Sequence, residues 1–200
     1  MTNRDAELQT FVDAAHAAFA KFTNHAESER SIGQIFDVLK QPGEQRAGEG
    51  KQLPVCQYLD AAMAVDLQEP SLRRLVESFR AIAPRLDWRR RVDTAGTASG
   101  NYVDGHGNAM VLGPGGIEAR NDLWIGATLL APNVRYPDHD HAPEETYLVL
   151  SHSEFRQGDD DWFAPGIGGS FYNIPDIKHA MRSLDTPLFA FWALLVKNPH

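Results

Sequence analysis

The stretch YPDHDHAPEETY, residues 136–147, determines how this chain of 200 residues is interpreted, because it concentrates side chains that can bind a metal ion. It places His139 and His141 two positions apart in a chain with eight histidines, and then Glu145 and Tyr147 two apart. In a β-strand, residues i and i+2 project from the same face. The pattern therefore predicts two strands joined by a turn at residues 142–144, with imidazole, carboxylate and phenol groups directed to one point.

A later segment, NIPDIKHAMRS at residues 173–183, supplies a further histidine on another predicted strand. His179 follows Pro175 there and could complete the metal shell. Imidazole nitrogen and carboxylate oxygen suit zinc, iron, manganese, nickel or cobalt, so we expect one divalent transition metal, and the spacing does not choose among these ions. The other histidines have no comparable cluster of metal-binding residue types near them in the sequence. They are interpreted as structural: His16, His25, His106, His152 and His200.

The chain after about residue 92 reads as short β-like runs separated by glycine, proline and asparagine. Many short strands at close spacing are typical of a β-sandwich or a small barrel. The predicted fold is therefore mainly β in this part. The runs lie at residues 101–116, 123–132, 145–150, 153–157, 169–175, 177–183 and 188–196.

The first ninety residues have helical periodicity instead. Apolar positions recur at helical spacing in residues 8–22 and 32–39, with Thr2 or Asn3 as the expected cap of the first helix. Two more helices are expected, one after Pro54 and one capped by Ser71. We expect a helical N-terminal region at residues 1–90 and a β domain with the metal site at residues 91–200.

The segment QPGEQRAGEGKQ, residues 41–52, is polar and rich in glycine, without hydrophobic periodicity. We expect a mobile loop, which is either a plain connector or a lid that closes over the site.

Composition excludes several classes of function. Subtracting 27 acidic from 19 basic residues gives a net charge of −8, which disfavours a nucleic-acid partner. The run Arg89 to Arg91 is too short to reverse this and is interpreted as a solvated turn or an ion-pair cluster.

The single cysteine, Cys56, excludes an internal disulfide. The apolar run at residues 188–196 is too short to span a bilayer. We expect a soluble cytoplasmic protein without a membrane partner, as a monomer or small homo-oligomer.

The metal-binding pattern resembles the cupin superfamily. His139, His141, Glu145 and His179 are similar to its two motifs, although PDIKH replaces the common PxGxxH. This resemblance implies a cupin double-stranded β-helix, a jelly-roll barrel that holds a metal between its sheets, here with an N-terminal α-helical region.

A closer resemblance is to the cupin-type dimethylsulfoniopropionate (DMSP) lyases of marine bacteria, in the form with a helical N-terminal region. Both YPDHDHAPEETY and NIPDIKHAMRS are similar to that family's active-site segments. The resemblance implies His141, Glu145 and His179 as metal ligands, and Tyr147 as a further ligand that can detach. Tyr136 and His139 would line the substrate pocket, and His139 is left open as either a ligand or a polar contact.

The reaction implied by the resemblance is β-elimination of DMSP to dimethyl sulfide and acrylate, with Tyr147 as general base and the metal as Lewis acid. Tyr136 and His139 would orient the substrate, and no cofactor beyond the metal is needed. Two alternatives stay open: a cupin oxygenase that uses ferrous iron and O₂, and a non-catalytic cupin that binds a small molecule. Aromatic faces could hold the cationic sulfonium, and the candidates are Trp124, Trp162, Phe171, Tyr172 and Trp192.

Overall fold

The computed structural model describes residues 3–196. Its helices are α1 (Ala6–Phe22), α2 (Ala26–Val38), the 3-10 helix η1 (Pro54–Tyr58), α3 (Leu59–Met63), α4 (Pro70–Ile82), the 3-10 helix η2 (Ala83–Arg85) and α5 (Tyr102–Gly105). The strands are β1 (Glu44–Gln45), β2 (Trp88–Arg89), β3 (His106–Leu112), β4 (Glu118–Ala119), β5 (Leu123–Leu130), β6 (Glu144–Val149), β7 (Ser153–Gln157), β8 (Ser170–Asn173), β9 (His179–Ser183) and β10 (Leu188–Leu195). The expected order of a helical region followed by a β region is confirmed.

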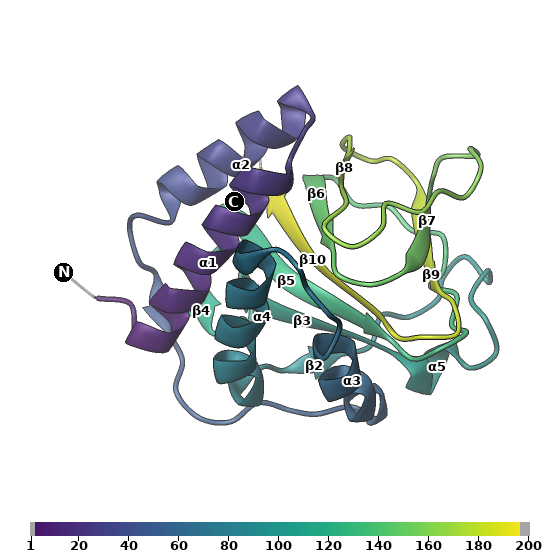
Figure 1. The fold of residues 1–200 in the computed structure, drawn as a ribbon, viewed down its shortest axis with the longest axis horizontal. Coiled ribbons are helices and arrows are strands. Elements are labelled where there is room, and N and C mark those ends of the chain that lie inside the picture. Colours follow the sequence, from purple (N-terminus) through teal and green to yellow (C-terminus); the bar gives the residue numbers. More distant parts are fainter. Residues whose placement is uncertain (1–2, 197–200) are drawn as a thin grey trace.

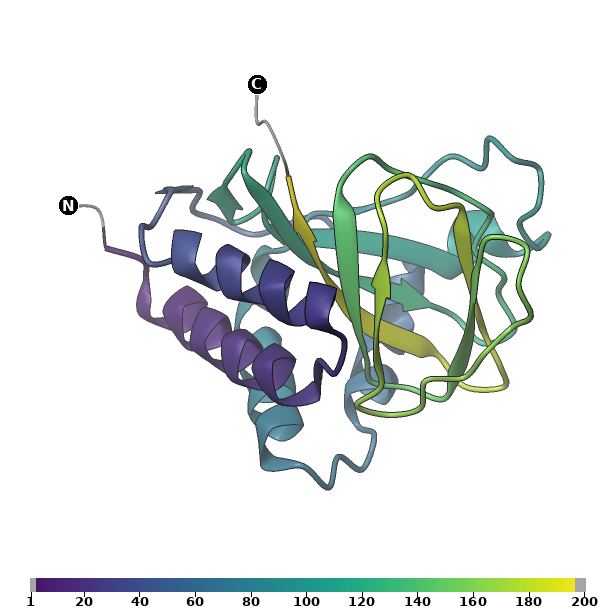
Figure 2. The ribbon, with the colours of Figure 1, turned by 90° about the horizontal axis from the view of Figure 1, so that it is seen from above.

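The strands form two sheets that curl into a barrel (Figure 2). The larger sheet has eight strands in the order β1-β4-β3-β5-β10-β6-β8, with β2 paired to β3 outside this path. The smaller sheet pairs β7 with β9. Isolated bridges from Arg135 to Arg182 and from His139 to His179 attach the segment before β6 to the smaller sheet. Residues of the metal-binding pattern therefore come from both sheets.

The N-terminal helices cover the outer face of the larger sheet (Figure 1). Phe79 of α4 contacts Phe189 and Phe191 of β10, with ring centroids 5.5 and 5.0 Å apart, and Phe11 of α1 lies 6.0 Å from Phe191. Helix α2 runs beside β10 and β6. One hydrophobic core contains side chains from the helices and the strands. The division into residues 1–90 and 91–200 stays a prediction, and the two parts share this core.

Three local expectations are wrong at element ends. Helix α1 is capped by Asp5, whose side chain accepts the Leu8 N–H at 2.9 Å, and not by Asn3; Thr2 lies outside the described residues. Helix α4 begins at Pro70, after Glu69, and not at a Ser71 cap, because proline is pre-organised for the first helical turn. The run at residues 101–116 begins with α5 before it becomes β3. None of the helices within residues 3–196 is long and apolar enough to cross a membrane.

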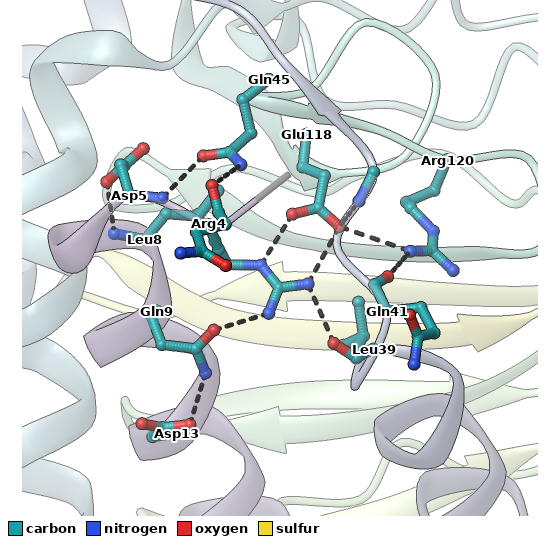
Figure 3. A network of polar contacts seen from close by, with 12 residues as sticks. Arg4, Asp5, Leu8, Gln9, Asp13, Leu39, Gln41, Gln45, Glu118 and Arg120 are labelled. Atoms are coloured by element: carbon teal, nitrogen blue, oxygen red, sulfur yellow. Dashed lines mark hydrogen bonds and ion pairs between the residues drawn. The ribbon is translucent and has the colours of Figure 1, made fainter. Parts of the chain in front are cut away.

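A buried ion pair attaches the start of the chain to the sheet (Figure 3). The Glu118 carboxylate on β4 accepts hydrogen bonds from Arg4 Nε at 2.7 Å, from a second Arg4 nitrogen at 3.0 Å and from the Gly43 N–H at 2.9 Å. Arg4 also donates to the carbonyl of Leu39, just after α2. Both charges are buried, and Arg4 is the nearer of two cationic partners of Glu118, since Arg120 lies 3.4 Å from the same carboxylate.

We expect Arg4→Met to lower the free energy of unfolding by about 3 kcal/mol, because it leaves the buried Glu118 charge without its main partner. Chemical denaturation measures this loss. The matched control is Arg74→Met on the exposed face of α4, which should change stability by less than about 0.5 kcal/mol. Adding Glu118→Gln to Arg4→Met should recover part of the loss. Equal stability of Arg4→Met and the wild type would contradict this role.

Candidate active site

The register of the larger sheet places one row of side chains on its inner face. On β10, Trp192 pairs with Gly126 of β5 on one side and with Tyr147 of β6 on the other. Glu145, two residues from Tyr147, projects from the same face of β6. Phe189 and Phe191 alternate with Trp192 and face the helices instead. The strand pairing therefore directs Glu145 and Tyr147 into the barrel.

A cavity of about 280 Å³ lies over this inner face. It combines polar and charged side chains with an apolar and aromatic wall. Its lining consists of Arg90, Arg91, Asn108, Met110, Trp124, Thr128, Tyr136, His139, His141, Glu145, Tyr147, Met181, Trp192 and Leu194.

Three predicted ligands converge beside the cavity. His141 lies in the loop before β6, Glu145 on β6, and His179 at the start of β9. One possible ligand atom from each lies within 4.8 Å of the others, and among the described residues no other such group of three or more is found. The Nε2 atoms of His141 and His179 lie 3.2 and 3.3 Å from Oε2 of Glu145. The structure thus brings together residues separated by almost forty positions.

The hydrogen bonds of the two histidines show that this group fits a cation. His141 Nδ1 lies 2.8 Å from the Pro143 carbonyl, and His179 Nδ1 lies 2.9 Å from the Ile177 carbonyl. A carbonyl only accepts, so Nδ1 donates the ring proton and Nε2 of the neutral ring keeps its lone pair. Both lone pairs then face a carboxylate, which also only accepts. The buried His179 Nε2 has no hydrogen-bond partner among the described residues. A divalent transition metal would bind all three acceptors.

Glu145 is buried as a carboxylate. Burial raises its pKa, but a protonated imidazole can compensate the carboxylate as a metal ion would, and hydrogen bonds and charge from protonated His141 and His179 hold the Glu145 pKa well below its usual range. The Asn173 amide of β8 also donates to Oε2 at 2.9 Å. For His141 the reverse holds: burial lowers its pKa, and the interaction with Glu145 raises it on balance. Each group stabilises the charged form of the other.

His139 and His141 do not share a strand as the sequence predicts. His139 makes an isolated β-bridge with His179, and His141 lies in the loop that follows. Pro137 and Pro143 flank them, and proline lacks the N–H that a continuous ladder needs. The His139 ring still lies 4.0 Å from the His179 ring, centroid to centroid. Burial, and then the proximity of His179, lower the pKa of His139 well below its usual value.

The two tyrosines of the motif are both buried at the cavity. Tyr147 stacks on Phe171 of β8, with ring centroids 5.0 Å apart. Burial and the adjacent Glu145 carboxylate raise the pKa of Tyr147 well above its usual value. The Tyr136 hydroxyl accepts a hydrogen bond from the Asn108 amide at 2.8 Å. Tyr147 therefore lies next to the candidate ligands, whereas Tyr136 belongs to a separate polar chain.

This chain of side-chain hydrogen bonds runs along the cavity wall, and no sequence motif identifies its members. Trp192 Nε1 donates to Thr128 Oγ1 at 3.0 Å, and Thr128 Oγ1 donates to Asn108 Oδ1 at 2.6 Å. Asn108 then donates to Tyr136. The chain joins β10, β5, β3 and the segment before β6. Only strand pairing could have identified Asn108 and Thr128.

The aromatic residues considered as contacts for the sulfonium form two groups, one at the cavity and one away from it. Trp124 and Trp192 line the cavity, and Phe171 lies behind Tyr147. Trp162 instead lies under the guanidinium groups of Arg135, Arg156 and Arg182, and Tyr172 stacks on His25 and donates to Glu144.

The other histidines and the glycine-rich loop lie away from this group. His16 stacks on Phe36, His106 on Tyr102, His152 is exposed, and His200 lies outside the described residues. None of residues 41–52 lines the cavity. Instead β1 pairs with β4, and residues 50 and 51 hydrogen-bond to Pro84 and Trp88. The structure thus does not place the expected lid over the site.

Two solved structures of similar architecture establish the fold. The crystal structure of the DMSP lyase DddQ from Ruegeria pomeroyi DSS-3 has a TM-score of 0.77 and 18% identity, covering 98% of this chain and 95% of that one. A crystal structure from work on the DMSP lyases RdDddP and RnDddQII has a TM-score of 0.71 and 20% identity, covering 96% and 93%. The molecule is a cupin barrel with an N-terminal helical region, as expected.

The sequence also shows the family. The family model described as dimethylsulfoniopropionate lyase matches residues 27–190, more than half of the chain. The chain therefore belongs to the DMSP lyase family, and the resemblance found in its two histidine segments is confirmed. No curated protein matches the sequence.

We expect His179→Ala to weaken metal affinity by more than about 10-fold, because it removes one of three ligands, a larger change than the loss of a supporting contact. Elemental analysis of the purified variant measures the bound metal. His141→Ala and Glu145→Gln should behave alike, and the exposed His152→Ala is the matched control with wild-type content. Full metal occupancy in all three ligand variants would refute the assignment of the site.

Proposed function

We propose that this protein is a metal-dependent lyase that cleaves DMSP to dimethyl sulfide and acrylate by β-elimination. The observation that carries the proposal is the position of Tyr147. It is a buried phenol on the cavity wall, two residues from Glu145 on the same face of β6 and beside His179. Membership of the DMSP lyase family supports the substrate class.

In the proposed reaction Tyr147 acts as general base. Its phenolate oxygen takes a proton from the carbon next to the substrate carboxylate. The electron pair of that C–H bond forms the carbon–carbon double bond of acrylate. The C–S bond breaks, its electron pair stays on sulfur, and the sulfonium leaves as neutral dimethyl sulfide. Atoms and charge balance with one proton released, so no redox partner is needed.

The environment of Tyr147 explains why a metal belongs in this proposal. Burial and Glu145 raise the pKa of the phenol, which disfavours the phenolate that the base requires. A divalent ion held by His141, Glu145 and His179 would supply positive charge that favours this phenolate and stabilises the negative charge developing beside the substrate carboxylate. Tyr147 is also proposed as a further ligand that can detach.

Other cavity residues are proposed to hold the substrate. His139 offers a polar contact beside the ligand group, and Tyr136 is held by Asn108. Trp124 and Trp192 provide aromatic faces for the cationic sulfonium, an attraction worth about 0.5 to 2 kcal/mol. The cavity is near the small end of the range for ligand pockets, which suits a short-chain substrate.

Purified protein loaded with metal should release dimethyl sulfide from DMSP, and gas chromatography of the headspace measures this product. Equimolar acrylate should appear in solution, because both products come from one C–S cleavage. Oxygen consumption in place of dimethyl sulfide would instead identify an oxygenase. Binding of DMSP without either product would identify a non-catalytic cupin.

Tyr147→Phe should lower turnover by about 10² to 10⁴, because it removes the general base. The phenyl ring should still stack on Phe171, so the fold and most of the bound metal should be retained. Tyr58→Phe on η1, away from the cavity lining, is the matched control and should turn over at the wild-type rate. Turnover of Tyr147→Phe within a few-fold of the wild type, at equal metal content, would reassign the base to Tyr136 or His139.

A further inference from the structure

The three consecutive arginines at residues 89–91 have different surroundings. Arg89 and Arg90 form ion pairs with Asp87 and Asp104. Arg91 has no ion pair within residues 3–196, and one of its terminal nitrogens donates only to the backbone carbonyl of Asp140, at 3.3 Å. Arg91 is exposed and lines the cavity. Its guanidinium therefore carries a positive charge that no neighbouring carboxylate neutralises.

The backbone of Arg91 is held on both sides. Its N–H donates to His106 Nε2 at 2.8 Å, and its carbonyl accepts from the Tyr102 hydroxyl at 2.9 Å. His106 Nδ1 contacts the Tyr102 carbonyl and so carries the ring proton, which leaves Nε2 as the acceptor. The buried rings of Tyr102 and His106 stack with centroids 3.6 Å apart. This clamp of two backbone hydrogen bonds fixes the backbone position of Arg91. It therefore reduces the conformational entropy that Arg91 loses when its side chain binds a ligand.

Arg91 also lies between two cavities. With His139, it lines both the main cavity and a neighbouring one of about 320 Å³. Arg91 shares the cavity lining with Tyr136, and its positive charge lowers the pKa of Tyr136, although burial is the larger influence and raises that pKa. Its field therefore reaches the cavity interior. In a chain of net charge −8, this local positive charge favours an anionic group at the cavity.

We propose that Arg91 recognises the carboxylate of the substrate at the cavity mouth and selects for short carboxylic acids. The inference rests on the proposed function and extends it, since it names the residue that distinguishes a carboxylate from an uncharged analogue. An arginine suits this task because its planar guanidinium can donate two parallel hydrogen bonds to a carboxylate. Arg90 lines the same cavity but is already paired with Asp104.

The test compares two probes of nearly equal shape, the anion propionate and the neutral amide propionamide, by calorimetric titration of metal-loaded protein. Arg91→Ala should weaken propionate binding by about 10-fold or more, because it removes a hydrogen bond between two charged groups. Propionamide binding should change less than about two-fold, since it has no charge to lose. Arg91→Lys should be intermediate. The neighbouring Arg89→Ala, which keeps the clamp, is the matched control and should match the wild type.

Turnover gives a second readout. Arg91→Ala should raise KM for DMSP by about 10-fold or more and change kcat only a few-fold, since it removes binding common to the ground and transition states. Propionate binding to Arg91→Ala within two-fold of the wild type would overturn the inference, as would an equal loss of propionamide binding. A protein without lyase activity that still loses propionate binding through Arg91→Ala would refute the proposed function and support this inference.

Discussion

The paired position of β10 is the constraint on which the rest of the structure depends. This strand lies between β5 and β6, so its backbone is hydrogen-bonded on both sides and its side chains are covered on both faces. Phe189 and Phe191 meet the helices, whereas Trp192 lies on the cavity. A slip of one residue would exchange these two sets. Attachment of the helices and construction of the site therefore depend on the same register.

The candidate ligands place three hydrogen-bond acceptors close together in a buried position. Around Glu145, two imidazole lone pairs and a carboxylate lie within hydrogen-bond distance, and all three are acceptors. Burying such groups is unfavourable without a cation or protons to compensate them. Second contacts from Pro143, Ile177 and Asn173 nevertheless hold each group in place. This arrangement sacrifices stability for a pre-organised site, as is common where proteins bind metals.

Several features of the fold and the site could be predicted because their signals are local. Alternation and turn residues indicated the strands after residue 92, and helical periodicity indicated α1, α2 and α4. Helix starts were predicted less well, because Asp5 competes with the nearby cap candidate Asn3 and Pro70 starts α4 one residue before Ser71. The predicted strand through His139 and His141 was wrong, because proline interrupts the ladder on either side. The lid was unsupported because Glu44 and Gln45, within residues 41–52, pair with β4 at a sheet edge and none of the segment lines the cavity.

By itself, the sequence indicated the mainly β class and, through two short segments, the family, and the family resemblance singled out His141, Glu145 and His179, which the structure brings together. The tertiary structure alone decided which other residues reach the cavity. Asn108 and Thr128 are ordinary strand residues, and Arg91 stands in an unremarkable basic run. Asn108 and Thr128 meet the motif because backbone hydrogen bonds between strands align positions far apart in the chain, and side-chain spacing along one strand carries no record of that pairing. Arg91, just beyond β2, is held at the cavity by the side chains of His106 and Tyr102.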